Sequence, residues 1–136
     1  MAPKDIGYGM SVEVALPFAD AVERTVQELA NEGFGVLTEI DVKATLKKKL
    51  DVDFRPYVIL GACNPPLAHK ALSAERDIGL LLPCNVVVYA SDDPSKTVVA
   101  AIDPIKQLEI TGNTGITPIA KDVRSKLEHV LERIGS

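Results

Sequence analysis

The sequence predicts an α+β fold, with a mainly antiparallel sheet covered by helices. Three observations lead to this prediction. Short strand-like apolar runs alternate with helical patterns, two of these runs follow each other as a hairpin, and the longest helical patterns lie near the chain ends. We expect the order β-α-β-(α)-β-(α)-β-β-α, with short helices in parentheses. A doubly wound parallel fold is disfavoured because short helices make poor crossovers and no GxGxxG motif follows a strand.

The first half of the chain contains two predicted strands and two predicted helices. Residues 6–15 alternate loosely between apolar and polar side chains, which is typical of a half-buried strand. A helix opens at Pro17 and ends near Gly33. Its apolar stripe is Phe18, Val22, Val26, Leu29 and Ala30. Residues 34–40 form the second strand, and Asp41 is a good N-cap for the short helix that follows.

The middle of the chain continues with residues 57–62 as a strand. Asn64 can cap the next short helix, and Pro65 suits its first turn. The apolar stripe of that helix is Leu67, Ala68, Ala71 and Leu72. Residues 80–90 form a nearly continuous apolar run, as expected for a central strand buried on both faces. Pro83 indicates that the first residues of this run are unpaired or bulged.

The last third begins with residues 96–103, which predict a strand that pairs as an antiparallel hairpin with the one before it. Residues 104–117 look like an ordered excursion. Thr117 and Pro118 then start a final helix. The expected core face of this helix is Ile119, Val123, Leu127, Val130 and Ile134.

Length and composition limit the classes of protein to which this chain can belong. The chain of 136 residues suits a single domain spanning residues 1–136, and with 46% apolar but only 4% aromatic residues its core must be aliphatic. A net charge of −4 opposes a nucleic-acid surface. Neither a signal peptide nor an apolar run of about 20 residues is present, so we expect a soluble cytoplasmic protein without a membrane partner. Its cysteines should be thiols.

Both cysteines fall between residues 56 and 89, where we place the candidate site. Cys63 precedes a helix N-terminus, which favours a thiolate that could serve as a nucleophile or a soft metal ligand. A small buried thiol is the alternative. Cys84 could approach Cys63 if their strands are antiparallel neighbours, whereas parallel strands would separate the sulfur atoms. Cys84 could also simply fill the core.

Polar residues of the same segment complete the candidate set. His69 lies off the apolar stripe of its helix, where it could bind a metal or haem or carry a proton, unless it is merely an exposed histidine. Glu75, with Arg76 and Asp77, could clamp a polar ligand or form an exposed salt-bridged turn. No CxxC or HxxxH motif occurs, so the sequence gives little support to a closed zinc site, and no Walker or GxSxG motif is present.

Four blocks of sequence resemble a known family. They are Gly33–Val42 (GFGVLTEIDV), Tyr57–Pro65 (YVILGACNP), Ala68–Leu72 (AHKAL) and Leu81–Val86 (LLPCNV), and together they are similar to the family called domain of unknown function 302. The resemblance covers roughly residues 7–103. It implies an α+β fold and a homodimer. It also implies that haem, if bound as proposed for some family members, would be held by His69.

Three interpretations of the segment remain. We favour a homodimeric module that binds a small molecule, a metal or haem near Cys63, Asn64, His69, Glu75 and Cys84. The second is a thiol-dependent redox enzyme or sensor, with Cys63 as nucleophile, His69 as base and Cys84 as resolving thiol. In the third, these residues only fix a strand-to-helix corner. The mutual position of Cys63, His69 and Cys84 distinguishes the three.

Overall fold

A six-stranded antiparallel sheet forms the centre of the molecule. The computed structural model describes residues 2–136. Its strand order is β1-β2-β6-β5-β4-β3, and every neighbouring pair is antiparallel. The strands are β1 (Lys4–Asp5), β2 (Gly9–Val14), β3 (Gly35–Asp41), β4 (Tyr57–Cys63), β5 (Cys84–Ala90) and β6 (Thr97–Ile102). This arrangement confirms the predicted α+β class and the hairpin of β5 and β6.

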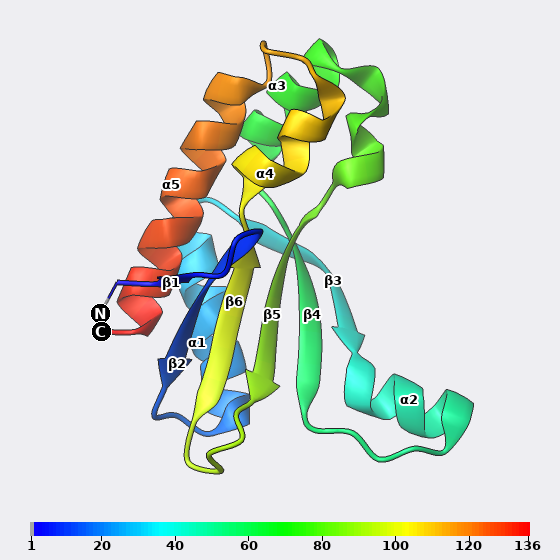
Figure 1. The fold of residues 1–136 in the computed structure, drawn as a ribbon, viewed down its shortest axis with the longest axis vertical. Coiled ribbons are helices and arrows are strands. Elements are labelled where there is room, and N and C mark those ends of the chain that lie inside the picture. Colours follow the sequence, from blue (N-terminus) through cyan, green and yellow to red (C-terminus); the bar gives the residue numbers. More distant parts are fainter. Residues whose placement is uncertain (1) are drawn as a thin grey trace.

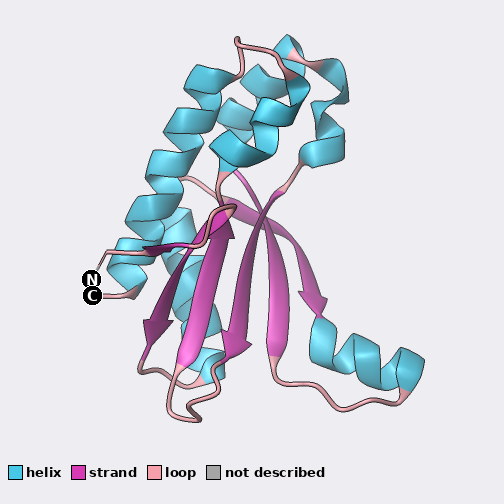
Figure 2. Cartoon of the chain, viewed as in Figure 1, coloured by secondary structure: helices cyan, strands magenta, loops and turns pink. Residues whose placement is uncertain are grey.

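Helices cover one face and one end of this sheet (Figure 1, Figure 2). Helices α1 and α5 pack against a single face, α2 projects beyond the edge strand β3, and α3, η1 and α4 form a cap over one end. The helices are α1 (Phe18–Asn31), α2 (Val42–Leu50), α3 (Pro65–Ala74), α4 (Pro104–Leu108) and α5 (Thr117–Ile134), with 3₁₀ turns η1 (Arg76–Leu81) and η2 (Glu109–Thr111). Within residues 2–136, no helix combines the length and apolarity that crossing a bilayer requires.

The buried side chains divide into two groups. The main core lies between the inner face of the sheet and helices α1 and α5, where Val12, Leu60 and Leu127 are almost completely buried. A smaller group lies under the cap, and we call it the cap cluster. The cap cluster consists of Ala71, Ile78, Leu108, Ile116 and Ala120. Helix α5 serves both groups because its first turns pack in the cap cluster and the rest of the helix packs in the main core.

Two predicted helix caps are confirmed. A side-chain oxygen of Asp41 accepts a hydrogen bond from the backbone N–H of Ala44 at 2.9 Å, and α2 begins at the next residue. Oδ1 of Asn64 accepts a hydrogen bond from the backbone N–H of Leu67 at 3.3 Å, and Pro65 lies in the first turn of α3. In each case the side chain satisfies an N–H that has no partner within the helix.

The buried face of α1 differs from the predicted stripe. Leu29 is buried as expected, but Val26 and Ala30 are exposed. Thr25 is buried instead, and its hydroxyl donates to the carbonyl of Ala21 at 2.7 Å. Because this internal hydrogen bond satisfies the hydroxyl, a threonine can occupy a core position that hydropathy assigns to an apolar residue.

The apolar run at residues 80–90 is not one strand. Residues 76–81 form η1, the Leu82–Pro83 peptide bond is cis, and strand β5 begins only at Cys84. Leu80 and Leu81 end the 3₁₀ turn and are followed by apolar residues of β5, so hydropathy alone does not locate the boundary between the two elements, nor does it indicate that Leu80 is 88% exposed. The excursion at residues 104–117 contains helix α4, whose N-terminus is capped by Asp103.

Candidate functional site

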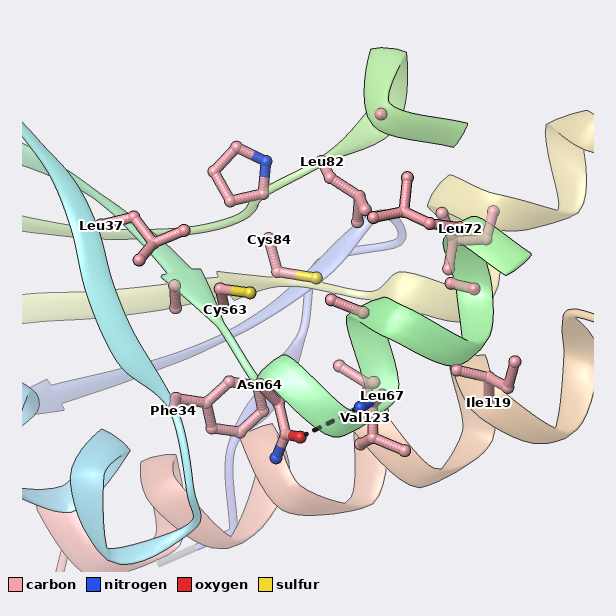
Figure 3. Close-up of a pocket in the computed structure, with 16 residues that line it drawn as sticks. Phe34, Leu37, Cys63, Asn64, Leu67, Leu72, Leu82, Cys84, Ile119 and Val123 are labelled. Carbon is pink, nitrogen blue, oxygen red and sulfur yellow. Dashed lines mark hydrogen bonds between the residues drawn. The ribbon is translucent and has the colours of Figure 1, made fainter. Parts of the chain in front are cut away.

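An apolar cavity lies where the ends of β4 and β5 meet the cap (Figure 3). Its volume is about 290 Å³. Main-core side chains form one side, cap-cluster side chains form another, and the first turns of α3 form part of the wall. The residues that bound it most directly include Phe34, Leu67, Ala71, Leu82, Leu108 and Val123. The cavity therefore occupies the boundary between the two groups of buried side chains.

Both cysteines line this cavity. Cys63 is the last residue of β4, and Cys84 is the first residue of β5. These strands are antiparallel neighbours with Ala62 opposite Cys84, which is the arrangement that brings the two thiols to the same end of the sheet. Both are free thiols, and their sulfur atoms point toward α3 in Figure 3. The sequence did not decide whether the strands that carry Cys63 and Cys84 run parallel or antiparallel, and in the structure they are antiparallel.

Burial controls the chemistry of Cys84. Its side chain is buried, and this desolvation, together with the nearby Cys63 thiol, raises the pKa of the Cys84 thiol to about 11. The Sγ atom lies 3.9 Å from Oε1 of Gln107, so the neutral thiol acts as a weak hydrogen-bond donor. Near neutral pH, Cys84 is consequently a thiol and a poor nucleophile.

Asn64 is the only residue of the cavity lining whose side chain carries nitrogen or oxygen. Its Oδ1 accepts from the N–H of Leu67, and its Nδ2 donates to the carbonyl oxygen of Glu32 at 3.4 Å. The amide thus connects the start of α3 to the turn that leads into Phe34 and β3. These contacts fix the orientation of Asn64, as the sequence-predicted cap requires, and leave the cavity wall almost entirely apolar.

His69 and Glu75 lie away from the cavity wall. His69 is exposed on α3 and is not part of the lining, whereas Ala68 and Leu72 are. Around a helix the four lining residues of α3, which are Leu67, Ala71, Ala68 and Leu72, span an arc of about 140°, and His69 falls about 60° beyond the end of that arc. The carboxylate of Glu75 accepts from Nδ2 of Asn113 at 3.1 Å and joins the end of α3 to the loop before α5.

The structure does not assemble a three-ligand metal site from these residues. In the described part of the chain, no three His, Cys, Asp or Glu side chains come close enough together to hold a metal ion. Cys63 and Cys84 share a cavity, but His69 does not join them. A haem held by His69 would lie on the exposed side of α3, outside the cavity wall that carries the two thiols.

Comparison with known proteins identifies the family. The model of the domain of unknown function DUF302 matches residues 10–134. This chain belongs to the DUF302 family. A crystal structure described as an uncharacterized conserved DUF302 protein from Bacillus stearothermophilus is similar, with a TM-score of 0.86 and 31% sequence identity. The match covers 93% of this chain and 98% of the other. A search of curated proteins gives no match.

Two residues at the DUF302 cavity were not predicted from the sequence: Leu37, which lines it, and Gln107, which contacts the lining residue Cys84. Gln107 lies on α4, inside the segment that the sequence described only as an excursion. The Asp103–Pro104 pair is a cap followed by a first-turn proline, and it could have revealed this helix. Leu37 reaches the cavity from β3 next to a register shift between Val36 and Thr38. Hydropathy carries no signal for such a bulge.

Proposed function

We propose that this DUF302 protein binds a small, mainly apolar molecule in the cavity beside Cys63 and Cys84. The observation that carries the proposal is the cavity itself. Its volume is about 290 Å³, and its wall is apolar except for Asn64 and the two thiols. Ligand sites in proteins are commonly apolar hollows with a few fixed polar groups, and this volume is close to the lower end of their range.

Exposed apolar residues at the cavity support access from solvent. Leu37 and Leu72 line the cavity, yet their exposed fractions are 67% and 42%. Gly79 of η1 also lines it and is exposed. Leucines that are exposed on one side and face a hollow on the other suit the entrance of a site for an apolar ligand. We place the entrance between β3 and the pair α3 and η1.

The lining favours recognition by shape. Oδ1 and Nδ2 of Asn64 each have one protein partner, so at most one N–H and one lone pair of this amide remain for a ligand. Cys63 and Cys84 offer soft, polarizable sulfur atoms that make good contacts with apolar or aromatic groups. A ligand of this cavity is therefore uncharged over the part that enters, because no lining side chain would compensate a buried charge.

Fluorescence titration with N-phenyl-1-naphthylamine, a neutral apolar probe, tests the proposal. We expect saturable binding to the native protein with one probe per chain. The Ala68→Phe substitution puts a bulky ring at the cavity wall and should weaken this binding by about tenfold or more. Ala74→Phe is the matched control, since Ala74 is an exposed residue of the same helix outside the lining and should leave binding unchanged.

The variants must remain folded for this comparison. Equal urea midpoints for the two variants establish that a loss of binding does not come from unfolding. Absence of saturable binding by the native protein, or equal binding by both variants, contradicts the proposal.

A further inference from the structure

The two edges of the sheet differ in how they are protected (Figure 1). One edge is β1, which consists of two charged and exposed residues, Lys4 and Asp5. A short charged edge strand is a common protection against pairing with a further strand. The other edge is β3, which has seven residues without lysine or proline, and its Leu37 and Ile40 are 67% and 48% exposed. Only β3 is therefore long enough and apolar enough to accept another strand.

Backbone groups of β3 are unpaired on the side that faces away from β4. Within residues 2–136, no backbone–backbone hydrogen bond joins residues 35–40 to any segment other than β4. The ladder with β4 is regular from Thr38 to Asp41, and the bulge near Val36 affects one end of the strand only. This open edge presents N–H and C=O groups at the spacing of a strand, a pattern that another extended backbone matches.

The cavity opens beside this edge. Leu37 lies on β3 and lines the cavity together with Cys63 and Pro83 (Figure 3). A seventh strand would run about 4.8 Å from β3 and would pass the entrance that we place between β3 and the pair α3 and η1. Side chains of a strand alternate between its two faces, so one residue of that strand can direct its side chain into the entrance. The volume of about 290 Å³ exceeds that of a leucine or phenylalanine side chain.

The charge of β3 indicates which segment fits its edge. Glu39 is exposed, and in the described part of the chain its carboxylate forms no ion pair. Asp41 is also exposed. Pairing of two copies of β3 would place four carboxylates along one short ladder, and no basic residue of β3 would compensate them. A segment that carries lysine or arginine compensates them, so charge favours a basic segment over a second copy.

We propose that β3 binds an extended peptide segment of another protein, which adds to the sheet as a seventh strand and inserts one apolar side chain into the cavity. This inference rests on the proposed function, because it uses the same cavity, and it names the ligand as a peptide with an apolar residue flanked by basic residues. In this mode of recognition, main-chain hydrogen bonds supply affinity and a pocket for a side chain supplies specificity. The open edge supplies the first, and the cavity beside Leu37 supplies the second.

A synthetic heptapeptide, Lys-Thr-Thr-Leu-Thr-Thr-Lys with an amidated C-terminus, tests the proposal. We expect its fluorescein-labelled form to bind saturably in fluorescence anisotropy, with one peptide per chain, and its acetylated form to displace N-phenyl-1-naphthylamine. Replacing the leucine with aspartate should weaken binding by about tenfold or more. The Ala68→Phe variant should weaken it similarly, and the matched control Ala74→Phe should leave it unchanged.

Backbone methylation separates strand pairing from simple filling of the cavity. Consecutive residues of a strand direct their N–H groups to opposite sides. N-methylation of one of the two threonines before the leucine therefore removes a donor to β3, and N-methylation of the other removes a donor to solvent. We expect about tenfold weaker binding for one methylated peptide and nearly unchanged binding for the other. The peptide should also slow deuterium exchange at β3 amides.

Several results would overturn the proposal. These are no saturable peptide binding up to about 1 mM, binding that does not displace the probe, and equal effects of the two methylations. Slow exchange of β3 amides in the protein alone, with a dependence on protein concentration, would assign the edge to a second copy and also overturn it. If the naphthylamine probe binds and the peptide does not, this inference alone fails, whereas failure of the probe to bind contradicts the proposed function.

Discussion

Gln107 lies beside Cys84, with its Oε1 atom 3.9 Å from the sulfur. Nε2 of the same side chain donates to the carbonyl oxygen of Leu81, which is the last residue of η1. One amide therefore connects α4 to the end of η1 and to the start of β5. This contact holds the cap against the sheet beside the cavity.

Replacing Gln107 should loosen this connection. Gln107→Met keeps the length of the side chain but removes the donor to Leu81, and we expect the free energy of unfolding to fall by about 1–2 kcal/mol. Urea denaturation measures the change. Lys106→Met, at an exposed neighbouring position, is the control and should change stability much less. Equal midpoints for the two variants would show that the contact contributes nothing.

The Cys84 thiol should be unreactive in the native protein. Its pKa of about 11 leaves very little thiolate at pH 8. In a Cys63→Ala variant, where Cys84 is the remaining thiol, we expect slow alkylation by iodoacetamide whose rate rises about tenfold per pH unit up to pH 10. The same variant in urea should react rapidly at pH 8 to 9. Native alkylation that reaches its plateau below pH 9 is inconsistent with this environment.

The same shift predicts a loss of stability in alkali. The folded protein holds the Cys84 proton more tightly than the unfolded chain, so the thiol contributes its full stabilisation below about pH 9 and loses it as pH rises toward 11. Since the pKa of Cys84 rises from its ordinary value near 9 to about 11, the free energy of unfolding that is lost across this pH range is about 2–3 kcal/mol. Urea midpoints from pH 8 to 10.5 measure the slope. Cys84→Ala should flatten it, and an unchanged slope in that variant would assign the loss to other groups.

Gly61 should tolerate no side chain. A Cβ at this position would overlap Oγ1 of Thr38 and would lie 2.8 Å from Cγ of Pro83. We expect Gly61→Ala to lower the free energy of unfolding by about 1–3 kcal/mol. Gly35→Ala on the neighbouring strand is the matched control, because a Cβ there meets no atom within 4 Å.

A double variant separates the two contacts of Gly61. Adding Thr38→Ala removes the hydroxyl and should restore part of the stability lost in Gly61→Ala, while the contact with Pro83 remains. Thermal denaturation of the four proteins measures this coupling. Strictly additive effects of the two substitutions would rule out the clash with Thr38.

Asn64 should stabilise the corner through both ends of its amide. Asn64→Ala removes the cap of α3 and the bond to Glu32, and we expect a loss of about 1–2 kcal/mol. Asn64→Asp keeps the oxygen that caps the helix but loses the donor to Glu32, so its loss should be smaller. Chemical denaturation compares the two, and a larger loss for the aspartate variant would contradict the capping role.

Much of this fold follows from local chemistry that is visible in the sequence. Asp41 and Asn64 begin helices because their side chains accept from exposed N–H groups, and this depends only on near neighbours. The antiparallel order of β5 and β6 follows from the short turn between them. These predictions succeed because the deciding interactions lie within a few residues along the chain.

The parts that were not predicted depend on contacts distant in sequence. The shift from η1 to β5 near Pro83 occurs within a uniformly apolar run, so hydropathy gives no boundary. The cavity joins Phe34, Cys63, Leu108 and Val123, which come from the turn before β3, from β4, from α4 and from α5. The position of His69 relative to the sulfur atoms depends on the rotation of α3 about its axis. Ala68 lines the cavity, but His69, the next residue along the helix, does not.

The division of the buried side chains has a dynamic consequence. The cap cluster and the main core meet along α5, and the cavity interrupts the packing between them, so fewer buried side chains hold the cap than hold the central strands. Amides of α3 and η1 should therefore exchange with deuterium faster than those of the central strands. A ligand in the cavity would contact both the cap cluster and the main core and should slow this exchange. The exchange rate therefore reports whether the cavity is occupied, even when the ligand has not been identified.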